Sequence, residues 1–291
     1  MSCLARKAVI CLACVFIASI SAVGNPAETD LPPKGLPADL FTVETRHLAP
    51  GLFVSAEAVL QMFKEKQDII LVDVRHGNDF EKFRIPGSIN IPFFALKTKI
   101  FFKKRLLILI NEGFGYSRLE QGCLQLRSAG FARVLILDGG LQLWNEKGAP
   151  LEGDVFAKNE MNKVLPQDLF QERDCANLVA VDVSETATPE AGRLIPRAVS
   201  VPYGGKDDFT GALKKIAAAR EEAPATNILI FNRTGKYAEG MERLIKEAGL
   251  KNIFYLQGGL AGYNTFLLQQ AAIWRKEDNR KTVKKKCATC P

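Results

Sequence analysis

One ordered series of signals occurs twice along the chain, and this repeat constrains the fold more than any other feature. Each series has an apolar run containing Asp, an Ile-Pro turn, two further apolar runs and a Gly-Gly pair, in that order. The first series lies at 69–75, 85–92, 106–110, 134–137 and 138–144, and the second at 179–184, 195–202, 227–231, 253–256 and 257–263. Continuously apolar strands alternating with amphipathic helices predict a parallel sheet covered on both faces. The chain is therefore predicted to hold two copies of one α/β domain.

The two series also divide the rest of the chain. At 291 residues, with 47% hydrophobic and 24% charged residues, it is long enough for two cores. We place the first domain at 51–150, a charged linker at 151–163 and the second domain at 164–272. Residues 25–50 carry several prolines and no clear period, which predicts a flexible leader that packs loosely or not at all. Residues 273–291 form a basic tail.

The N-terminus has the pattern of a secretory signal peptide. Arg6 and Lys7 precede an apolar run at 8–23, and a polar, Pro-containing stretch follows. We expect a signal peptide at 1–24, cleaved near Gly24, and a protein exported to the periplasm or envelope of a bacterium. A retained membrane anchor is the alternative, but the run is shorter than the ~20 residues of a typical span. A lipoprotein attached through Cys14 is less favoured because the apolar run continues past it.

Positive charge is concentrated at the C-terminus. The chain has 39 Lys and Arg against 32 Asp and Glu, and residues 275–291 alone hold seven basic and two acidic residues. The folded body is therefore close to neutral, and we expect no nucleic-acid partner. The tail is either a solvated end or a contact for an anionic membrane surface or an acidic partner.

The repeated landmarks resemble the rhodanese, or sulfurtransferase, family over nearly all of residues 52–272. The likeness rests on Asp-Val-Arg at 73–75, Ile-Pro-Gly-Ser-Ile-Asn-Ile-Pro at 85–92 and the Gly-Gly-x-x-x-Trp that ends at Trp144. The second copy keeps Asp182, with Ser184 in place of Arg75 and Tyr263 in place of Trp144. We expect Asp73 and Asp182 to hold loop amides, Pro86 and Pro196 to fix turns, and Trp144 to fill the core.

The resemblance also implies a working loop after the fourth strand of each domain. In active rhodanese-like domains this loop begins with a cysteine, whose persulfide is stabilised by the loop amides and the following helix. Here Asn232 stands at that position in the second copy, within Asn-Arg-Thr-Gly-Lys-Tyr. In the first copy Asn111 follows the strand, although a shifted register would put Glu112 or Gly113 there. The active-loop cysteine is therefore expected to be missing in both domains.

An anion site can survive without the cysteine. Loop amides, a helix dipole and two cations predict oxyanion binding in the second loop, and a weaker site in the first. The alternative is a loop that only keeps its inherited shape. The predicted site comprises Asn232, Arg233, Thr234, Gly235, Lys236 and Tyr237, and the weaker one Asn111, Gly113, Gly115 and Arg118.

Four cysteines remain after the signal peptide. Cys123 has the spacing of an apolar helix face and Cys175 precedes a strand, so both are interpreted as structural. Cys287 and Cys290 form a Cys-x-x-Cys pair beside three lysines, where cations favour thiolate. This pair is either a plain disulfide or a mobile dithiol arm that serves its own body or a partner. With only His47 and His76 in the chain we expect no metal site, and no cofactor.

Three hypotheses follow. The leading one is a non-catalytic tandem protein of the cell envelope that binds a small oxyanion or a partner protein. The second is a sulfur- or chalcogen-transferring enzyme that works through Cys287 and Cys290. The third is an accessory subunit of an envelope redox system, with the domains as docking surfaces.

Overall fold

The computed structural model describes most of the predicted two-domain region. The described residues are 46–49, 51–158, 160–186, 189–204, 206–221, 226–238 and 240–287. The predicted signal peptide, most of the leader, and Cys290 lie outside these ranges.

The first domain is built on a five-stranded sheet in the order β1-β6-β5-β2-β4, with every pairing parallel. Its strands are β1 (Phe53–Val54), β2 (Ile69–Asp73), β4 (Ile89–Asn90), β5 (Leu106–Ile110) and β6 (Arg133–Leu137). All five residues of the central strand β5 are buried, as its unbroken apolar run predicts. Two apolar clusters cover the two faces of the sheet.

Helices connect these strands and carry the two clusters. They are α2 (Ala56–Lys64), α3 (Gly77–Lys82), α4 (Phe93–Leu96), the 3₁₀ helix η3 (Ile100–Phe102), α5 (Tyr116–Ser128) and α6 (Gly140–Glu146). Ser55 caps α2, because its hydroxyl accepts a hydrogen bond from the Ala58 amide. Trp144 of α6 is almost fully buried, which confirms its place in the core.

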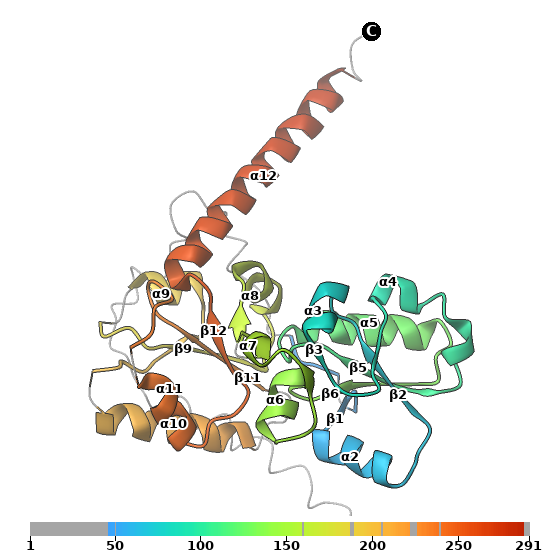
Figure 1. Ribbon diagram of the computed structural model, residues 1–291. Helices are drawn as coiled ribbons and strands as arrows, with labels where there is room; N and C mark the ends of the chain where they lie inside the picture. The colour runs from blue at the N-terminus through green and yellow to red at the C-terminus, as the bar shows by residue number, and fades with distance from the viewer. Residues whose placement is uncertain are drawn as a thin grey trace, which may run out of the picture.

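The second domain repeats this architecture. Its sheet has the order β10-β9-β11-β12-β8, again parallel throughout, which is the strand order of the first sheet. The elements are β8 (Lys163–Val164), α8 (Pro166–Glu172), β9 (Leu178–Asp182), α9 (Pro189–Leu194), β10 (Val199–Ser200), α10 (Lys206–Glu221), β11 (Asn227–Phe231), α11 (Met241–Glu247), β12 (Ile253–Leu256) and α12 (Gly259–Cys287). The two domains lie side by side (Figure 1). The predicted tandem of parallel-sheet α/β domains is thus confirmed.

The turn after each Ile-Pro pair shows how closely the copies match. Gly87 has φ of 77° in the first copy, and Arg197 has φ of 72° at the same place in the second. A left-handed backbone favours glycine, so Arg197 adopts it at a cost that tertiary structure must offset. The backbone of this turn is preserved even where its preferred residue is not.

The described end of the leader and the linker both make backbone pairings with the domains. Arg46 pairs with domain 2, because its amide donates to the Asp174 oxygen and its own oxygen accepts from the Ala176 amide, both at 2.8 Å. The rest of the predicted leader at 25–50 lies outside the described residues, so this contact concerns only its last part. Within the linker at 151–163, β7 (Glu152–Gly153) pairs antiparallel with β3 (Phe83–Arg84), and α7 (Val155–Lys158) follows.

Helix α12 extends the second domain far beyond its body. Its first part packs through Leu260, Tyr263 and Leu267 on one face of the second sheet. The same helix continues to Cys287, so no break in structure separates the second domain from the tail at 272/273. The far end projects away from both domains (Figure 1). Among the described helices, none combines the length and apolar character that crossing a bilayer requires.

Candidate functional site

Each domain presents one loop at the carboxyl edge of its sheet, directly after its central strand. The Asn111 oxygen accepts from the Leu141 amide, and the Asn232 oxygen accepts from the Leu260 amide, both at 2.9 Å. In each case the amide follows the Gly-Gly pair, whose glycines all have positive φ. This shared hydrogen bond makes Asn111 the counterpart of Asn232. The alternative alignments, which place Glu112 or Gly113 at the position equivalent to Asn232, are therefore excluded.

The side chain of Asn232 occupies the centre of the second loop. Its Oδ1 accepts from the Thr234 amide at 3.1 Å and from the Gly235 amide at 2.7 Å. Its Nδ2 donates to the Lys236 oxygen at 2.5 Å, and the Lys236 amide donates to the Thr234 hydroxyl at 3.3 Å. Three loop amides that the anion-site hypothesis assigned to a ligand are thus satisfied within the loop.

Gly235 is fixed by backbone contact. Its φ is 72°, and a Cβ built there would lie 2.7 Å or less from the amides of Gly258 and Gly259. The loop therefore packs directly on the Gly-Gly turn, where only glycine fits. This contact is a structural reason for the glycines that the repeat displays.

The helix whose positive end was expected to face the second loop begins later in the sequence. Helix α11 starts at Met241, after Gly240, so its positive end does not lie at the first residues of the loop. Tyr237 also differs from its predicted role, because its hydroxyl faces inward and contacts the oxygens of Ile230 and Leu256. Burial raises the pKa of this phenol. The helix dipole and Tyr237 thus drop out of the predicted anion site.

Two cations remain at the surface of the second loop. Arg233 and Lys236 are exposed on either side of Gly235, and neither makes an ion pair within the described ranges. What remains of the predicted site is thus an exposed pair of cations and not a closed amide cradle.

The first loop lies against the second domain. Asn111 Oδ1 accepts from the Gly113 amide at 2.9 Å, which matches the arrangement around Asn232. Phe114 then enters the core of domain 2, where its ring centroid lies 5.3 Å from that of Phe254. The loop between Asn111 and α5 therefore serves as a contact between domains.

A carboxylate of the second domain occupies the start of α5. Both oxygens of Glu172 accept from the Ser117 amide at 3.0 Å, and Glu172 itself is buried. Burial raises the pKa of this carboxyl, against the opposing effects of the Ser117 hydrogen bonds and the Arg46 charge. An anion favours a helix N-terminus, so the place where the first loop could have held an external anion is already filled.

The four residues of the weaker predicted site are consequently not brought together around open space. Gly113 approaches the Gly139 oxygen, Gly115 precedes α5 in a left-handed conformation, and Arg118 is exposed on the helix. Sequence reasoning missed Phe114 and Glu172 altogether. An aromatic residue between two loop glycines was the one available signal.

Glu112 lies at the same edge of the sheet. Burial raises the pKa of its carboxyl, opposed by the charge of Arg75. Arg75 is itself held by Asp73 in a buried ion pair of 2.8 Å. Asp73 accepts from the Arg75 amide and Asp182 from the Ser184 amide, both at 3.0 Å, which confirms that these two carboxylates hold loop amides.

Two of the three described cysteines are buried, and the third ends helix α12. Cys123 and Cys175 are buried, and burial raises the pKa of both. Cys287 is the last residue of α12, and at 1.5 Å per residue it lies about 42 Å along the helix from Gly259, which contacts the second loop. This length separates Cys287 from the loop that a dithiol arm would have to serve on its own domain.

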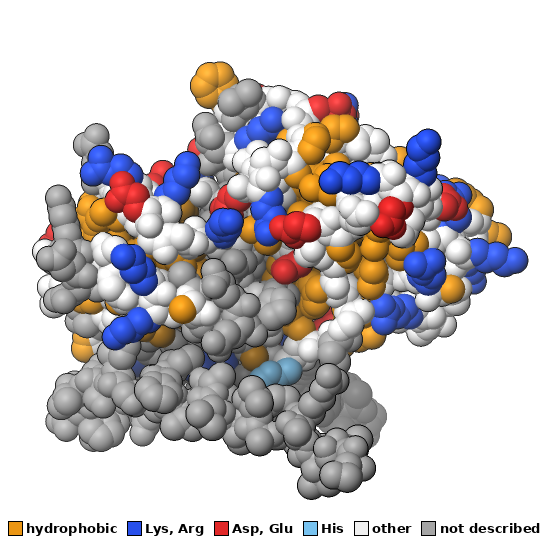
Figure 2. All heavy atoms as spheres, turned by 90° about the horizontal axis from the view of Figure 1, so that it is seen from below, with side chains coloured by type: hydrophobic (Ala, Val, Ile, Leu, Met, Phe, Trp, Pro, Cys, Tyr) orange, Lys and Arg blue, Asp and Glu red, His pale blue; other side chains and the backbone are white. Residues whose placement is uncertain are grey.

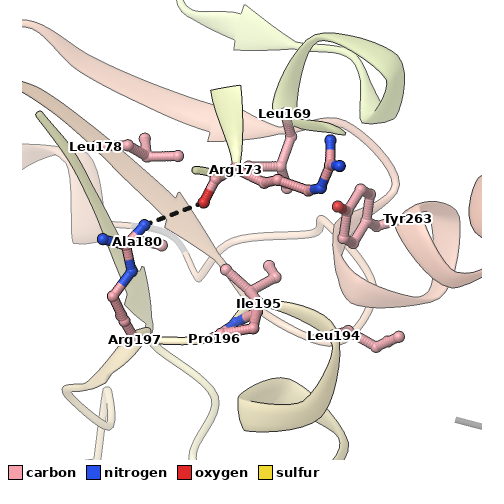
Figure 3. Close-up of a pocket in the computed structure, with 9 residues that line it drawn as sticks. All are labelled: Leu169, Arg173, Leu178, Ala180, Leu194, Ile195, Pro196, Arg197 and Tyr263. Atoms are coloured by element: carbon pink, nitrogen blue, oxygen red, sulfur yellow. Dashed lines mark hydrogen bonds between the residues drawn. The ribbon is translucent and has the colours of Figure 1, made fainter. Parts of the chain in front are cut away.

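A small pocket opens at the other edge of the second sheet, beside the amino end of β9 (Figure 3). Its walls are mostly apolar, and Arg197 donates across it to the Arg173 oxygen at 3.2 Å. The lining residues are Leu169, Arg173, Leu178, Ala180, Leu194, Ile195, Pro196, Arg197 and Tyr263. None of the predicted site residues lies here.

Two matching parallel sheets, each with a strand-end loop seated on a Gly-Gly turn, define a tandem protein of the rhodanese type. The sequence model of the rhodanese-like domain family matches residues 55–147 and 165–265. The chain therefore belongs to this family.

Relatives match mainly one domain at a time. A sulfurtransferase of Allochromatium vinosum is 27% identical over 101 residues, which make up 34% of this chain and 92% of that protein. Protein YibN of Escherichia coli is 31% identical over 90 residues, 30% of this chain and 62% of that protein.

Among solved structures, the Alr3790 protein of Anabaena is 26% identical. The match covers 36% of this chain and 84% of the Alr3790 chain, with a TM-score of 0.32. A thiosulfate sulfurtransferase of Pseudomonas aeruginosa is 19% identical. The match covers 73% of this chain and 42% of that protein's chain, also with a TM-score of 0.32.

Proposed function

We propose that this chain is an exported rhodanese-like protein of the bacterial cell envelope that binds an oxyanion group without transferring sulfur. The group belongs either to a small ligand or to an acidic side chain of an envelope partner. One observation carries the proposal: an asparagine side chain fills the loop after each central strand. An amide is not a nucleophile that can carry sulfur, while Arg233 and Lys236 keep the second loop cationic.

The first experiment tests sulfur transfer. The mature protein is given thiosulfate and cyanide, and we expect no thiocyanate above the uncatalysed rate. An Asn232→Cys variant supplies the missing thiolate, which would break the S–S bond of thiosulfate, release sulfite and gain one sulfur atom that mass spectrometry detects. Thiocyanate formation by the wild type that is lost in Cys287→Ser/Cys290→Ser would overturn the proposal in favour of an enzyme working through its tail.

The second experiment tests the loop as a binding site. Calorimetric titration with sulfate, thiosulfate and selenite is expected to show binding that Arg233→Ala abolishes. Arg243→Ala is the matched control, because Arg243 is also exposed in domain 2 but lies on α11. If none of the three anions binds, or if both variants lose binding equally, the second loop is not an oxyanion site.

Export is tested separately. Cell fractionation is expected to recover the protein in the periplasm or envelope, with a mature N-terminus near residue 25. A full-length cytoplasmic protein would contradict this part of the proposal alone.

A further inference from the structure

The segment between β4 and β5, residues 93–105, exposes large apolar side chains. Phe94 is 82% exposed, Ile100 69% and Phe101 68%. Single exposed apolar residues are ordinary, but three within eight positions form a patch that calls for a partner. We call residues 93–105 the aromatic-basic segment.

This segment is held in place by the domain beneath it. Leu96 is fully buried, and Phe93 and Phe102 pack against the same core cluster. The Ala132 amide donates to the Lys103 oxygen at 2.9 Å, which ties the end of the segment to the body. The exposed side chains therefore project from a folded turn, so little ordering entropy is lost when they are buried.

Positive charge surrounds the exposed apolar groups. No Asp or Glu occurs between Glu81 and Glu112, whereas residues 97–105 alone hold five Lys and Arg. Arg105 pairs with Asp68, and Lys97 donates to Gln125 at 2.7 Å. The other basic residues, Lys99, Lys103 and Lys104, have no ion pair in the described part of the chain.

The second domain shows that the fold does not require this composition. Its corresponding segment, between β10 and β11, contains the 16-residue helix α10. That segment carries acidic residues, including Asp207 and Glu221, and it buries Phe209 and Leu213. That segment also exposes basic residues, Lys214 and Lys215, but none of its described side chains is an exposed large hydrophobic residue, so the combination distinguishes the first copy within the described residues.

We propose that the aromatic-basic segment is a contact site for a bilayer that contains anionic lipid. Phe94, Ile100 and Phe101 enter the interfacial region while the lysines meet lipid headgroups, the combination by which amphipathic surfaces bind membranes. Each lysine near an anionic surface strengthens binding roughly fivefold. Helix α4, at the start of the segment, lies in the part of the first domain away from the second domain, on the side of the body from which α12 projects (Figure 1). The view from below shows the opposite face, on which basic, acidic and hydrophobic side chains are mixed at the first-domain end (Figure 2).

The test is co-sedimentation of the mature full chain with vesicles. We expect binding to phosphatidylglycerol mixed with phosphatidylcholine, weakening with salt, and little binding to phosphatidylcholine alone. Phe94→Ser/Phe101→Ser and Lys99→Gln/Lys104→Gln should each reduce the partition coefficient by tenfold or more, by loss of insertion or of charge. These positions are on the surface, and unchanged circular dichroism and Tm verify the fold of each variant.

Two control variants isolate the segment. Phe156→Ser removes an aromatic side chain that is 81% exposed on α7, and it should leave binding unchanged. Replacing Lys284, Lys285 and Lys286 of the tail by Gln should leave the dependence on Phe94 and Phe101 intact. Binding that survives Phe94→Ser/Phe101→Ser, or that disappears with the tail lysines, overturns the proposal. So does a lipid-independent dimer that the double Phe variant dissociates, because the segment would then bind a second copy of the chain.

Discussion

At the scale of single residues, Asn111 and Asn232 make equivalent hydrogen bonds in different surroundings. Asn111 is buried and holds the Gly113 amide and the Phe114 oxygen beneath domain 2. Asn232 makes its bonds in an exposed loop.

We therefore predict unequal costs for the same substitution. Asn111→Ala leaves a buried amide without a partner and should lower the free energy of unfolding by about 1–3 kcal/mol. Asn232→Ala should cost less than about 1 kcal/mol, because water replaces the lost partner. Urea denaturation of the two variants measures the difference. Equal costs would contradict the burial of the first loop.

The residue-scale features that the sequence predicts are those tied to local backbone geometry. The glycine pairs and the Asn that opens each loop follow from strand periodicity and turn chemistry, whereas the amide-holding roles of Asp73 and Asp182 are implied by the family resemblance. The register of the first loop could not be fixed this way. It needed the hydrogen bond from Leu141 to the Asn111 oxygen, which joins residues far apart in sequence.

At the scale of elements, α5 and α11 show how tertiary structure can change a helix boundary. Both follow a central strand, but α5 begins at Tyr116 with the Glu172 carboxylate at its first turn, whereas α11 begins only at Met241. The alternation of apolar strands with amphipathic helices predicted both helices. It did not predict the late start of α11, because the loop residues before it bond to one another instead.

Glu172→Gln tests this capping contact. Glutamine keeps an oxygen for the Ser117 amide and removes a charge whose burial raises the pKa of Glu172. The folded state of the wild type therefore binds a proton more tightly than the unfolded state. This binding gives the wild type additional stability relative to Glu172→Gln, which is fully present below the ordinary pKa of 4.5. That advantage should be lost as pH rises through the higher folded-state pKa.

Urea denaturation of both proteins across this pH range makes the comparison. Glu172→Ala is the control, since it also lacks the titrating carboxyl but removes the acceptor, so it should be about 1–2 kcal/mol less stable than Glu172→Gln at all these pH values. A stability difference between the wild type and Glu172→Gln that stays constant with pH would contradict the raised pKa.

At the scale of the whole molecule, the first loop joins the two domains. Phe114 lies in the core of domain 2, and Glu172 reaches across to an amide 55 residues away in sequence. The Asn252 amide donates to Glu146 at 2.7 Å as a further link. The repeat in the sequence predicts both domains, but it says nothing of their packing. The surfaces that meet are determined by individual side chains, and these side chains do not stand out in the sequence pattern of either copy.

Because Phe114 belongs to the core of the neighbouring domain, the two domains should unfold together. The chain has two tryptophans, of which Trp144 lies in the first domain and Trp274 packs against the core of the second. Variants that keep one tryptophan each, made by Trp144→Phe or Trp274→Phe, report on each domain separately. Their urea transitions should coincide when Phe114 is present.

Phe114→Ala should separate these transitions. Losing a buried phenylalanine costs about 3–5 kcal/mol, and here the loss falls on domain 2 and on the contact between domains. The Trp274 signal should therefore change at lower urea concentration than the Trp144 signal. Phe156→Ala, at an exposed position, should shift neither transition. Transitions that still coincide in Phe114→Ala would show that other contacts couple the domains, because the loop contact would then contribute too little to set their cooperativity.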